Sequence, residues 1–168
     1  MTMLIEMKVF GLAIDPITNT PIVILKDLEE KKAIPIWIGL FEASAIATEL
    51  EKISFSRPMT HDLVNEMLKI LDVEITKIVI NDLRNNTFFA VIHLVKNAEN
   101  ITVDSRPSDA IALALRANAH IFVDEKVVEK SMQMDFGKKT ADLSKYSKDK
   151  LEEFLESLSP EDFGKYKM

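Results

Sequence analysis

The chain contains no cysteine among its 168 residues. Disulfide bonds, zinc sites built from thiolates and a cysteine nucleophile are therefore excluded. Glycine and proline are also scarce, at four and six residues, and no glycine-rich loop of the kind that cradles phosphates occurs. The chain thus has no single motif that defines a site, and any site has to be assembled by the fold.

The sequence also lacks an apolar run of the roughly 18 residues that a membrane-spanning helix needs. Its N-terminus does not show the basic and then apolar layout of a signal peptide. We therefore expect a cytoplasmic protein with no membrane partner. The net charge of −6 argues against a broad surface that coats nucleic acid, which would be basic, but it leaves room for a small local phosphate site.

What is present is the composition of a folded globular protein, with 47% hydrophobic and 29% charged residues. Runs rich in β-branched residues predict an opening antiparallel meander and a second hairpin in the middle of the chain. The predicted strands cover residues 3–14, 22–25, 34–38, 73–82, 88–95, 101–103 and 120–123, the last of them as an edge strand. The pattern indicates an α+β fold in which helices pack on a mixed sheet of antiparallel hairpins.

Apolar residues at helical spacing predict four helices in the same part of the chain, over residues 41–53, 60–71, 110–117 and 124–131. Thr60 and Asp124 are the expected N-caps. The second helix is expected to be half buried, with Asn65 facing water. The third is apolar nearly all round, so we expect the domain or a subunit interface to enclose it, and we expect a homo-oligomer, most simply a dimer.

Two segments share the opening Ser-Arg-Pro, at residues 56–58 and 105–107. Each precedes a predicted helix, which suggests an internal duplication. From residue 133 the sequence changes character, with a linker followed by one small amphipathic helix over residues 147–158. We therefore divide the chain into a domain of residues 1–131 and a linker with a C-terminal helical tail, residues 132–168.

Carboxylates gather where predicted helices begin or strands end: Glu42, Asp62, Asp104 and Asp109. Such positions often supply ligands for the divalent cations of phosphodiester cleavage. Glu42, Asp104 and Asp109 are our predicted ligands for Mg²⁺ or another divalent cation, although no local spacing forms a metal motif. Helix capping explains Asp104 without any function, and a favourable place in the first turn explains Asp109.

Arg57 and Arg106 each precede a proline at a helix entrance. A guanidinium group binds phosphate or carboxylate through two parallel hydrogen bonds. One hypothesis is that both arginines hold a phosphate. The other is that they form structural ion pairs, such as Arg106 with Asp62 or Arg57 with Asp109.

His61 lies beside Asp62 in the first turn of a predicted helix and is the candidate for proton transfer to a phosphate ester. The alternative is that both are exposed first-turn residues with no role in chemistry. Trp37, the only tryptophan, is expected in the core rather than as a platform for a stacked base.

Three sequence blocks in a fixed order carry a resemblance to a known family: PIWIGLFEASAIATEL, RPMTHDLVNEML and DSRPSDAIALALRANAHIFVDEKVVE. Together they resemble the bifunctional nuclease domain family over roughly residues 3–131. The resemblance implies a compact α+β fold with DNase and RNase activity, and thus nucleic acid as the substrate.

The resemblance also directs attention to the motif positions Glu42, His61, Asp62, Asp104, Arg106, Ser108 and Asp109. We predict His61, Asp62, Arg106 and Ser108 as catalytic residues, beside Arg57 and Arg106 as phosphate-binding residues. The predicted function is metal-assisted hydrolysis of phosphodiester bonds in DNA or RNA. The alternative is a non-catalytic interaction or regulatory domain in which the Ser-Arg-Pro segments are structural.

Overall fold

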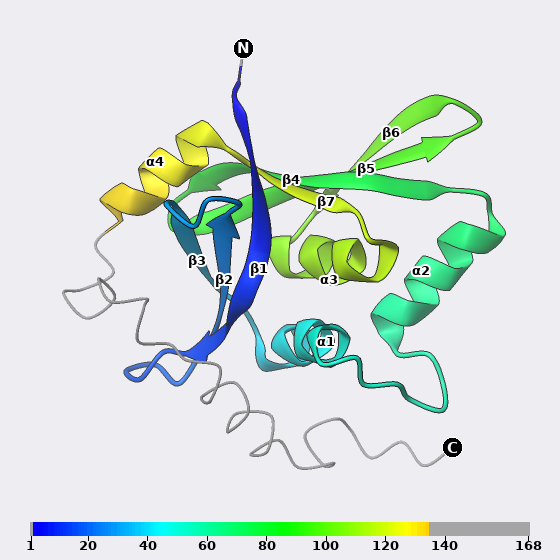
Figure 1. The fold of residues 1–168 in the computed structure, drawn as a ribbon, viewed down its shortest axis with the longest axis horizontal. Coiled ribbons are helices and arrows are strands. Elements are labelled where there is room, and N and C mark those ends of the chain that lie inside the picture. Colours follow the sequence, from blue (N-terminus) through cyan, green and yellow to red (C-terminus); the bar gives the residue numbers. More distant parts are fainter. Residues whose placement is uncertain (1, 135–168) are drawn as a thin grey trace.

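The computed structural model describes residues 2–134, which form seven strands and four helices (Figure 1). The strands are β1 (Leu4–Ile14), β2 (Pro21–Asp27), β3 (Ala33–Trp37), β4 (Glu74–Arg84), β5 (Thr87–Lys96), β6 (Glu99–Ser105) and β7 (His120–Asp124). The helices are α1 (Leu40–Leu50), α2 (Thr60–Ile70), α3 (Pro107–Ala117) and α4 (Glu125–Gln133). The predicted α+β class is confirmed, while the predicted tail helix lies outside the described residues. Within residues 2–134, no helix has the length and apolar character needed to cross a membrane.

The seven strands form one sheet in the order β3-β2-β1-β7-β4-β5-β6. Only β4 and β7 run parallel, so the sheet is mixed, as predicted. Both predicted hairpin regions are confirmed, as the β1–β2–β3 meander and the β4–β5 pair. Asn85 and Asn86 connect β4 to β5 with positive φ angles, a backbone conformation that asparagine tolerates well.

β7 lies in the middle of the sheet, so its prediction as an edge strand was wrong. It pairs with β1 on one side and with β4 on the other. Ile121 and Val123 are accordingly buried. Because its partners β1 and β4 come from distant parts of the chain, the five residues of β7 do not by themselves indicate this pairing. The two edges of the sheet are formed instead by β3 and β6, and residues 99–104 of β6 are exposed.

The apolar helix α3 is enclosed by its own domain. It packs against β4, β5 and β7, and α1 and α2 cover it from the other side (Figure 1). The consecutive residues from Ala110 to Ala114 are all buried. α3 therefore gives no argument for a subunit interface, and the homo-oligomer stays a prediction.

The helix α2 packs differently from its prediction. Its exposed residues include apolar ones: Leu63, Val64, Met67 and Ile70. The polar Asn65 is buried instead, so the expectation that Asn65 faces water was wrong. Of the sheet and helices around it, α2 contacts chiefly α3, and that single contact decides which side of α2 faces inward.

The start of α2 was also misplaced by one residue. Met59, not Thr60, is the N-cap, and its backbone N–H donates to Asp62 Oδ2 at 3.0 Å. The other predicted N-cap is confirmed, because the Asp124 side chain accepts from the Lys126 N–H at the start of α4.

The two Ser-Arg-Pro segments occupy different positions relative to their helices. Pro107 is the first residue of α3, where a missing N–H costs nothing. Pro58 comes two residues before α2 begins. The described residues thus do not show the internal duplication that the repeated tripeptide suggested.

Candidate functional site

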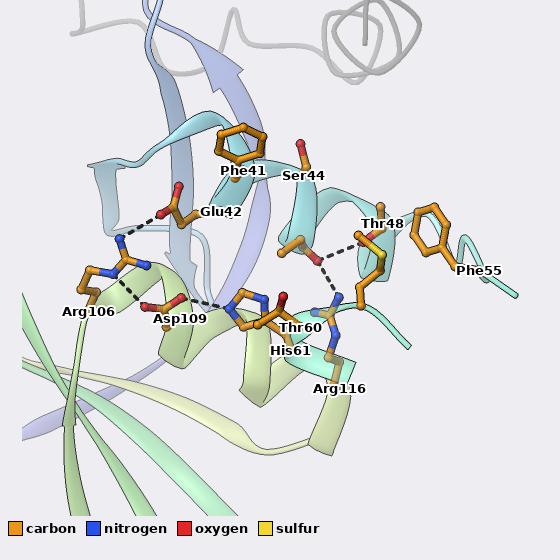
Figure 2. A pocket seen from close by; sticks show the side chains of 12 residues that line it. Phe41, Glu42, Ser44, Thr48, Phe55, Thr60, His61, Arg106, Asp109 and Arg116 are labelled. Carbon is orange, nitrogen blue, oxygen red and sulfur yellow. Dashed lines mark hydrogen bonds and ion pairs between the residues drawn. The ribbon is translucent and has the colours of Figure 1, made fainter. Parts of the chain in front are cut away.

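A cavity of about 370 Å³ lies between α1, α2 and α3 (Figure 2). Apolar and ionisable side chains share its wall: Phe41, Phe55, Met59, Glu42, His61, Arg106, Asp109 and Arg116. The cavity is formed by three segments distant in sequence, which meet because α1 and α2 both pack on α3.

Arg106, the N-cap of α3, joins α3 to α1. Its Nη1 donates to Glu42 Oε1 at 2.8 Å, and its Nε donates to Asp109 Oδ2 at 2.7 Å. The hydrogen bond to Asp109 is the main reason why the pKa of Arg106 is raised, with Glu42 adding to it. The side chain is nonetheless 65% exposed, so Arg106 presents a permanent positive charge at the cavity.

Asp109 connects Arg106 to His61 of α2. Its Oδ1 lies 2.9 Å from His61 Nε2, and Figure 2 shows the resulting chain from Glu42 through Arg106 and Asp109 to His61. Burial raises the pKa of the Asp109 carboxyl, but the hydrogen bonds with Arg106 and His61 together lower it by more, so the pKa lies below its ordinary value. Asp109 is therefore ionised at neutral pH. Because an ionised carboxylate only accepts hydrogen bonds, His61 must carry a proton on Nε2.

Arg116, near the end of α3, forms a second ion pair that the sequence did not predict. Its Nε donates to Asp62 Oδ1 at 2.6 Å, Nη1 to the Ala112 carbonyl at 2.9 Å and Nη2 to the Ala45 carbonyl at 3.0 Å. The side chain is only 5% exposed. Arg116 therefore fastens α1, α2 and α3 together. Basic residues are common in the last turn of a helix, where they interact favourably with the helix dipole, so the sequence alone did not mark Arg116 as the partner of Asp62.

The Asp62 carboxylate is held at the start of α2 from two sides. Burial raises the pKa of Asp62, while the hydrogen bonds from Arg116 and from the Met59 N–H lower it by more, so the pKa falls below its ordinary value. Asp62 directly follows His61 in the first turn of α2. The Asp62–Arg116 pair thus fixes the turn of α2 that carries His61.

The structure brings together some predicted residues and separates others. Glu42, His61, Arg106 and Asp109 share one cavity. Arg57 lies exposed in the loop before α2 and forms no ion pair with the described part of the chain. Neither ion pair proposed for the two arginines, Arg106 with Asp62 or Arg57 with Asp109, is formed, because other partners take these groups.

A second cavity of about 310 Å³ adjoins the first, since Glu42 and Arg106 line both. Ser108 lines only this second cavity, so it does not share a wall with His61. Trp37 also lines it and packs on a small buried cluster of β1 and β2 residues. Trp37 is thus half-buried at the border of the core, and its Nε1 donates to Asp15 Oδ2 at 2.9 Å.

The predicted metal ligands do not form a ligand set as they stand. Within residues 2–134, no three or more His, Asp or Glu side chains are grouped so that they could hold a metal ion. Glu42 and Asp109 both accept hydrogen bonds from Arg106, whose single positive charge offsets part of their negative charge. Asp104 is exposed on the edge strand β6 and does not line their cavity. The role of a divalent cation stays a prediction.

The fold and the cavity define a mixed α+β domain with an oriented histidine beside an exposed arginine. The chain matches the bifunctional nuclease domain over residues 23–135, and it belongs to that family, as the sequence predicted.

Relatives of similar length are found in Mycobacterium tuberculosis. The chain is 34% identical over 162 residues to "Uncharacterized protein MT1877" of strain CDC 1551 / Oshkosh, a match that covers 94% of this chain and 97% of the relative. The same figures hold for "Uncharacterized protein Rv1829" of strain ATCC 25618 / H37Rv. A shorter match, 29% identical over 93 residues, is to "Bifunctional nuclease 2" of Oryza sativa subsp. japonica and covers 54% of this chain and 29% of the rice protein.

Proposed function

We propose that this protein hydrolyses phosphodiester bonds of DNA or RNA in the cavity between α1, α2 and α3. The observation that carries the proposal is the 2.9 Å contact between His61 Nε2 and the ionised Asp109 carboxylate, next to the exposed Arg106. A histidine whose one nitrogen is bonded to a carboxylate is oriented to exchange a proton through the other nitrogen. Membership of the bifunctional nuclease domain family supports the choice of substrate.

In this proposal His61 acts as the general base. Its Nδ1 takes a proton from a water molecule while the water oxygen forms a bond to phosphorus. The bond from phosphorus to the leaving oxygen breaks, and that oxygen takes a proton from the imidazolium. Asp109 stabilises the positive charge on His61 between the two transfers.

Arg106 would bind the phosphate during the reaction. Two of its nitrogens are engaged by Glu42 and Asp109, whereas Nη2 donates to no residue in the described part of the chain. A guanidinium donor next to a phosphate oxygen stabilises the negative charge that grows in the transition state. Arg57, exposed in the loop before α2, would contact a phosphate further along the nucleic acid.

Asp62 would act as a positioning residue, because its carboxylate is committed to Arg116 and to the Met59 N–H. Mg²⁺ or another divalent cation at Glu42, Asp104 and Asp109 stays a prediction. A cytoplasmic location and a homo-oligomer, most simply a dimer, also stay predictions.

The test is hydrolysis of single-stranded DNA, duplex DNA and RNA by the purified protein, with and without a chelator. His61→Ala and Asp109→Asn should each lower the rate by roughly 10²–10⁴-fold, the usual contribution of general acid–base catalysis. Lys69→Ala, on the exposed side of α2, is the matched control and should retain full activity. Equal activity in all four proteins would mean that a contaminating enzyme is responsible and would overturn the proposal.

The second candidate is a non-catalytic interaction or regulatory domain. It is favoured by the ion pairs that tie the three helices together, since pairs of this kind can serve stability alone. This candidate predicts no hydrolysis by the wild-type protein under any metal condition. It also predicts that Arg106→Ala lowers the melting temperature.

A further inference from the structure

We propose that the second cavity binds a phosphorylated nucleoside, the nucleotide unit adjacent to the phosphodiester bond that is cleaved in the first cavity. The choice of a nucleotide rests on the proposed function. The existence of an anion site rests on the features of the second cavity itself, which are a buried hydroxyl, a helix start and a shared arginine.

The Ser108 hydroxyl is the first of these features. Ser108 is 6% exposed, and its side chain makes no hydrogen bond in the described part of the chain. Among the described residues, Asn81 is the only one with a completely buried side-chain oxygen or nitrogen that lacks a partner. The Ser108 oxygen also lacks a partner, so it is not completely buried and keeps some contact with solvent. The second cavity, which Ser108 lines, is where a ligand can reach that oxygen. Because this oxygen has no hydrogen-bond partner in the described part of the chain, it is free to donate a hydrogen bond to a ligand in the cavity.

The start of α3 supplies further donors at the same place. Ser108 and Asp109 lie in the first turn of this 11-residue helix, whose backbone N–H groups have no carbonyl partner within the helix. The helix dipole adds a partial positive charge there. The first hydrogen bond of the helix is made by the Ala110 N–H, which donates to the Arg106 carbonyl. Because Pro107 has no N–H, a phosphate at this helix start would meet two unpaired backbone donors, the N–H groups of Ser108 and Asp109.

Arg106 adds a full charge and connects the two cavities. It lines both, and its guanidinium is anchored on one side by Glu42 and on the other by Asp109. A nucleic-acid strand that crosses this arginine can place one phosphate in each cavity. Glu42 also lines both cavities, and because its negative charge repels an anion, it should weaken the binding of a phosphate.

The remaining wall is suited to a nucleoside rather than to a phosphate alone. Trp37 and Phe88 provide aromatic surface, and Asn86 and Thr87 provide polar groups from the β4–β5 turn. Aromatic side chains are common platforms for stacked bases. The volume of about 310 Å³ falls within the range of roughly 300–1,000 Å³ that is typical of small-molecule sites.

The fluorescence of Trp37 tests the proposal directly, because Trp37 is the only tryptophan of the chain. The wild-type protein is titrated with AMP, with adenosine and with inorganic phosphate. We expect a saturable change with AMP at a lower concentration than with either fragment. The proposal would be overturned if AMP caused no saturable change. It would also be overturned if adenosine bound as tightly as AMP, because the site would then not depend on the phosphate.

Variants then assign the site. Ser108→Ala should weaken AMP binding on the order of tenfold, as the loss of one hydrogen bond to a charged group predicts. Ser131→Ala is the matched control, because Ser131 is a buried serine of α4 that lines neither cavity. Glu42→Gln should strengthen AMP binding. Unchanged affinity in Ser108→Ala would overturn the assignment.

The same titration separates this inference from the proposed function. His61→Ala should lose hydrolysis but keep AMP binding, since His61 lines only the first cavity. If the wild-type protein binds AMP but hydrolyses nothing, the proposed function fails and the binding site stands. If it hydrolyses nucleic acid without any AMP effect on Trp37, the nucleotide site fails and the proposed function stands.

Discussion

The Arg116 guanidinium and the Asp62 carboxylate, 2.6 Å apart between Nε and Oδ1, join the end of α3 to the start of α2. The two residues are far apart in sequence, and the same guanidinium also binds carbonyl groups of Ala45 and Ala112. This ion pair is the buried polar link that holds the three helices around the first cavity.

Arg116→Met should destabilise the protein. The substitution keeps an apolar stem but leaves the Asp62 carboxylate and two carbonyl groups without their donor. The free energy of unfolding should fall by about 1.5–3 kcal/mol, the usual range for hydrogen bonds to charged groups. Urea unfolding measures the change. Arg84→Met is the control, because the Arg84 side chain at the end of β4 is 62% exposed, and it should change the free energy of unfolding by less than about 0.5 kcal/mol. An equal loss of stability in both variants would contradict the role of Arg116 in joining the helices.

Stability should decline in acid because of Asp62 and Asp109. Both carboxyls have a pKa in the folded protein below the ordinary value of 3.8, so the unfolded chain binds protons first as pH falls. Their contribution is complete above the unfolded value and is lost as pH falls through the folded pKa. Urea unfolding from pH 6 downwards should show a falling free energy below about pH 4. Asp62→Asn should show a shallower fall, and an unchanged slope would argue against this assignment.

Gly39→Ala should displace Glu42 while leaving the fold intact. A Cβ at residue 39 would collide with the Glu42 carboxylate, which is the mobile end of a long side chain. The backbone φ of −73° at Gly39 suits alanine, so the cost should stay below about 1 kcal/mol. NMR signals of the Arg106 guanidinium report the loss of its Glu42 partner. Gly11→Ala is the control, because a Cβ there meets no atom within 4 Å, and a similar spectral change in both variants would refute the mechanism.

Arg106→Ala should increase the affinity for divalent cations. Without the guanidinium, Glu42 and Asp109 lose the positive charge that they share and can share a cation instead. Calorimetric titration with Mn²⁺ compares the variant with the wild-type protein. Tighter Mn²⁺ binding by the wild-type protein than by the variant would contradict this prediction and would instead support the predicted metal site.

The exposed apolar side of α2 should tolerate charge. Met67→Lys and Ile70→Lys replace side chains that are 53% and 78% exposed, so the free energy of unfolding should change by less than about 0.5 kcal/mol. A marked loss would show that this side is covered in solution. Light scattering of the same samples tests the predicted homo-oligomer, since a wild-type dimer that becomes a monomer in both variants would place the contact on α2.

Much of the fold was predictable because its elements depend on local patterns. The hairpin of β4 and β5 follows from two β-rich runs around Asn85 and Asn86, whose side chains tolerate the backbone of a tight turn. The helix α3 follows from its alanine-rich apolar sequence. The orientation of α2 was not predictable, because Asn65 and Met67 both fit a helix and only the contact with α3 decides which of them is buried.

The candidate site was likewise predictable in part. The chemistry of His61, Arg106 and Asp109 was visible, because ionisable residues at helix starts stand out from the apolar pattern. The partners were not visible, since Arg106 binds Glu42 of α1 and Arg116 binds Asp62 of α2 across long sequence separations. Arg116 gave no signal of its own.

By itself, the sequence determined the family, the α+β class and the identity of the residues that can carry chemistry, because periodicity and motif order can be read along the chain without knowing which segments pack together. Only the tertiary structure decided that β7 is central, that Ser108 lines a different cavity from His61, and that Glu42 and Asp109 both pair with Arg106. The physical reason is that strand order and ion pairing depend on which distant segments pack together, and a carboxylate's partner is set by that packing rather than by its neighbours in sequence.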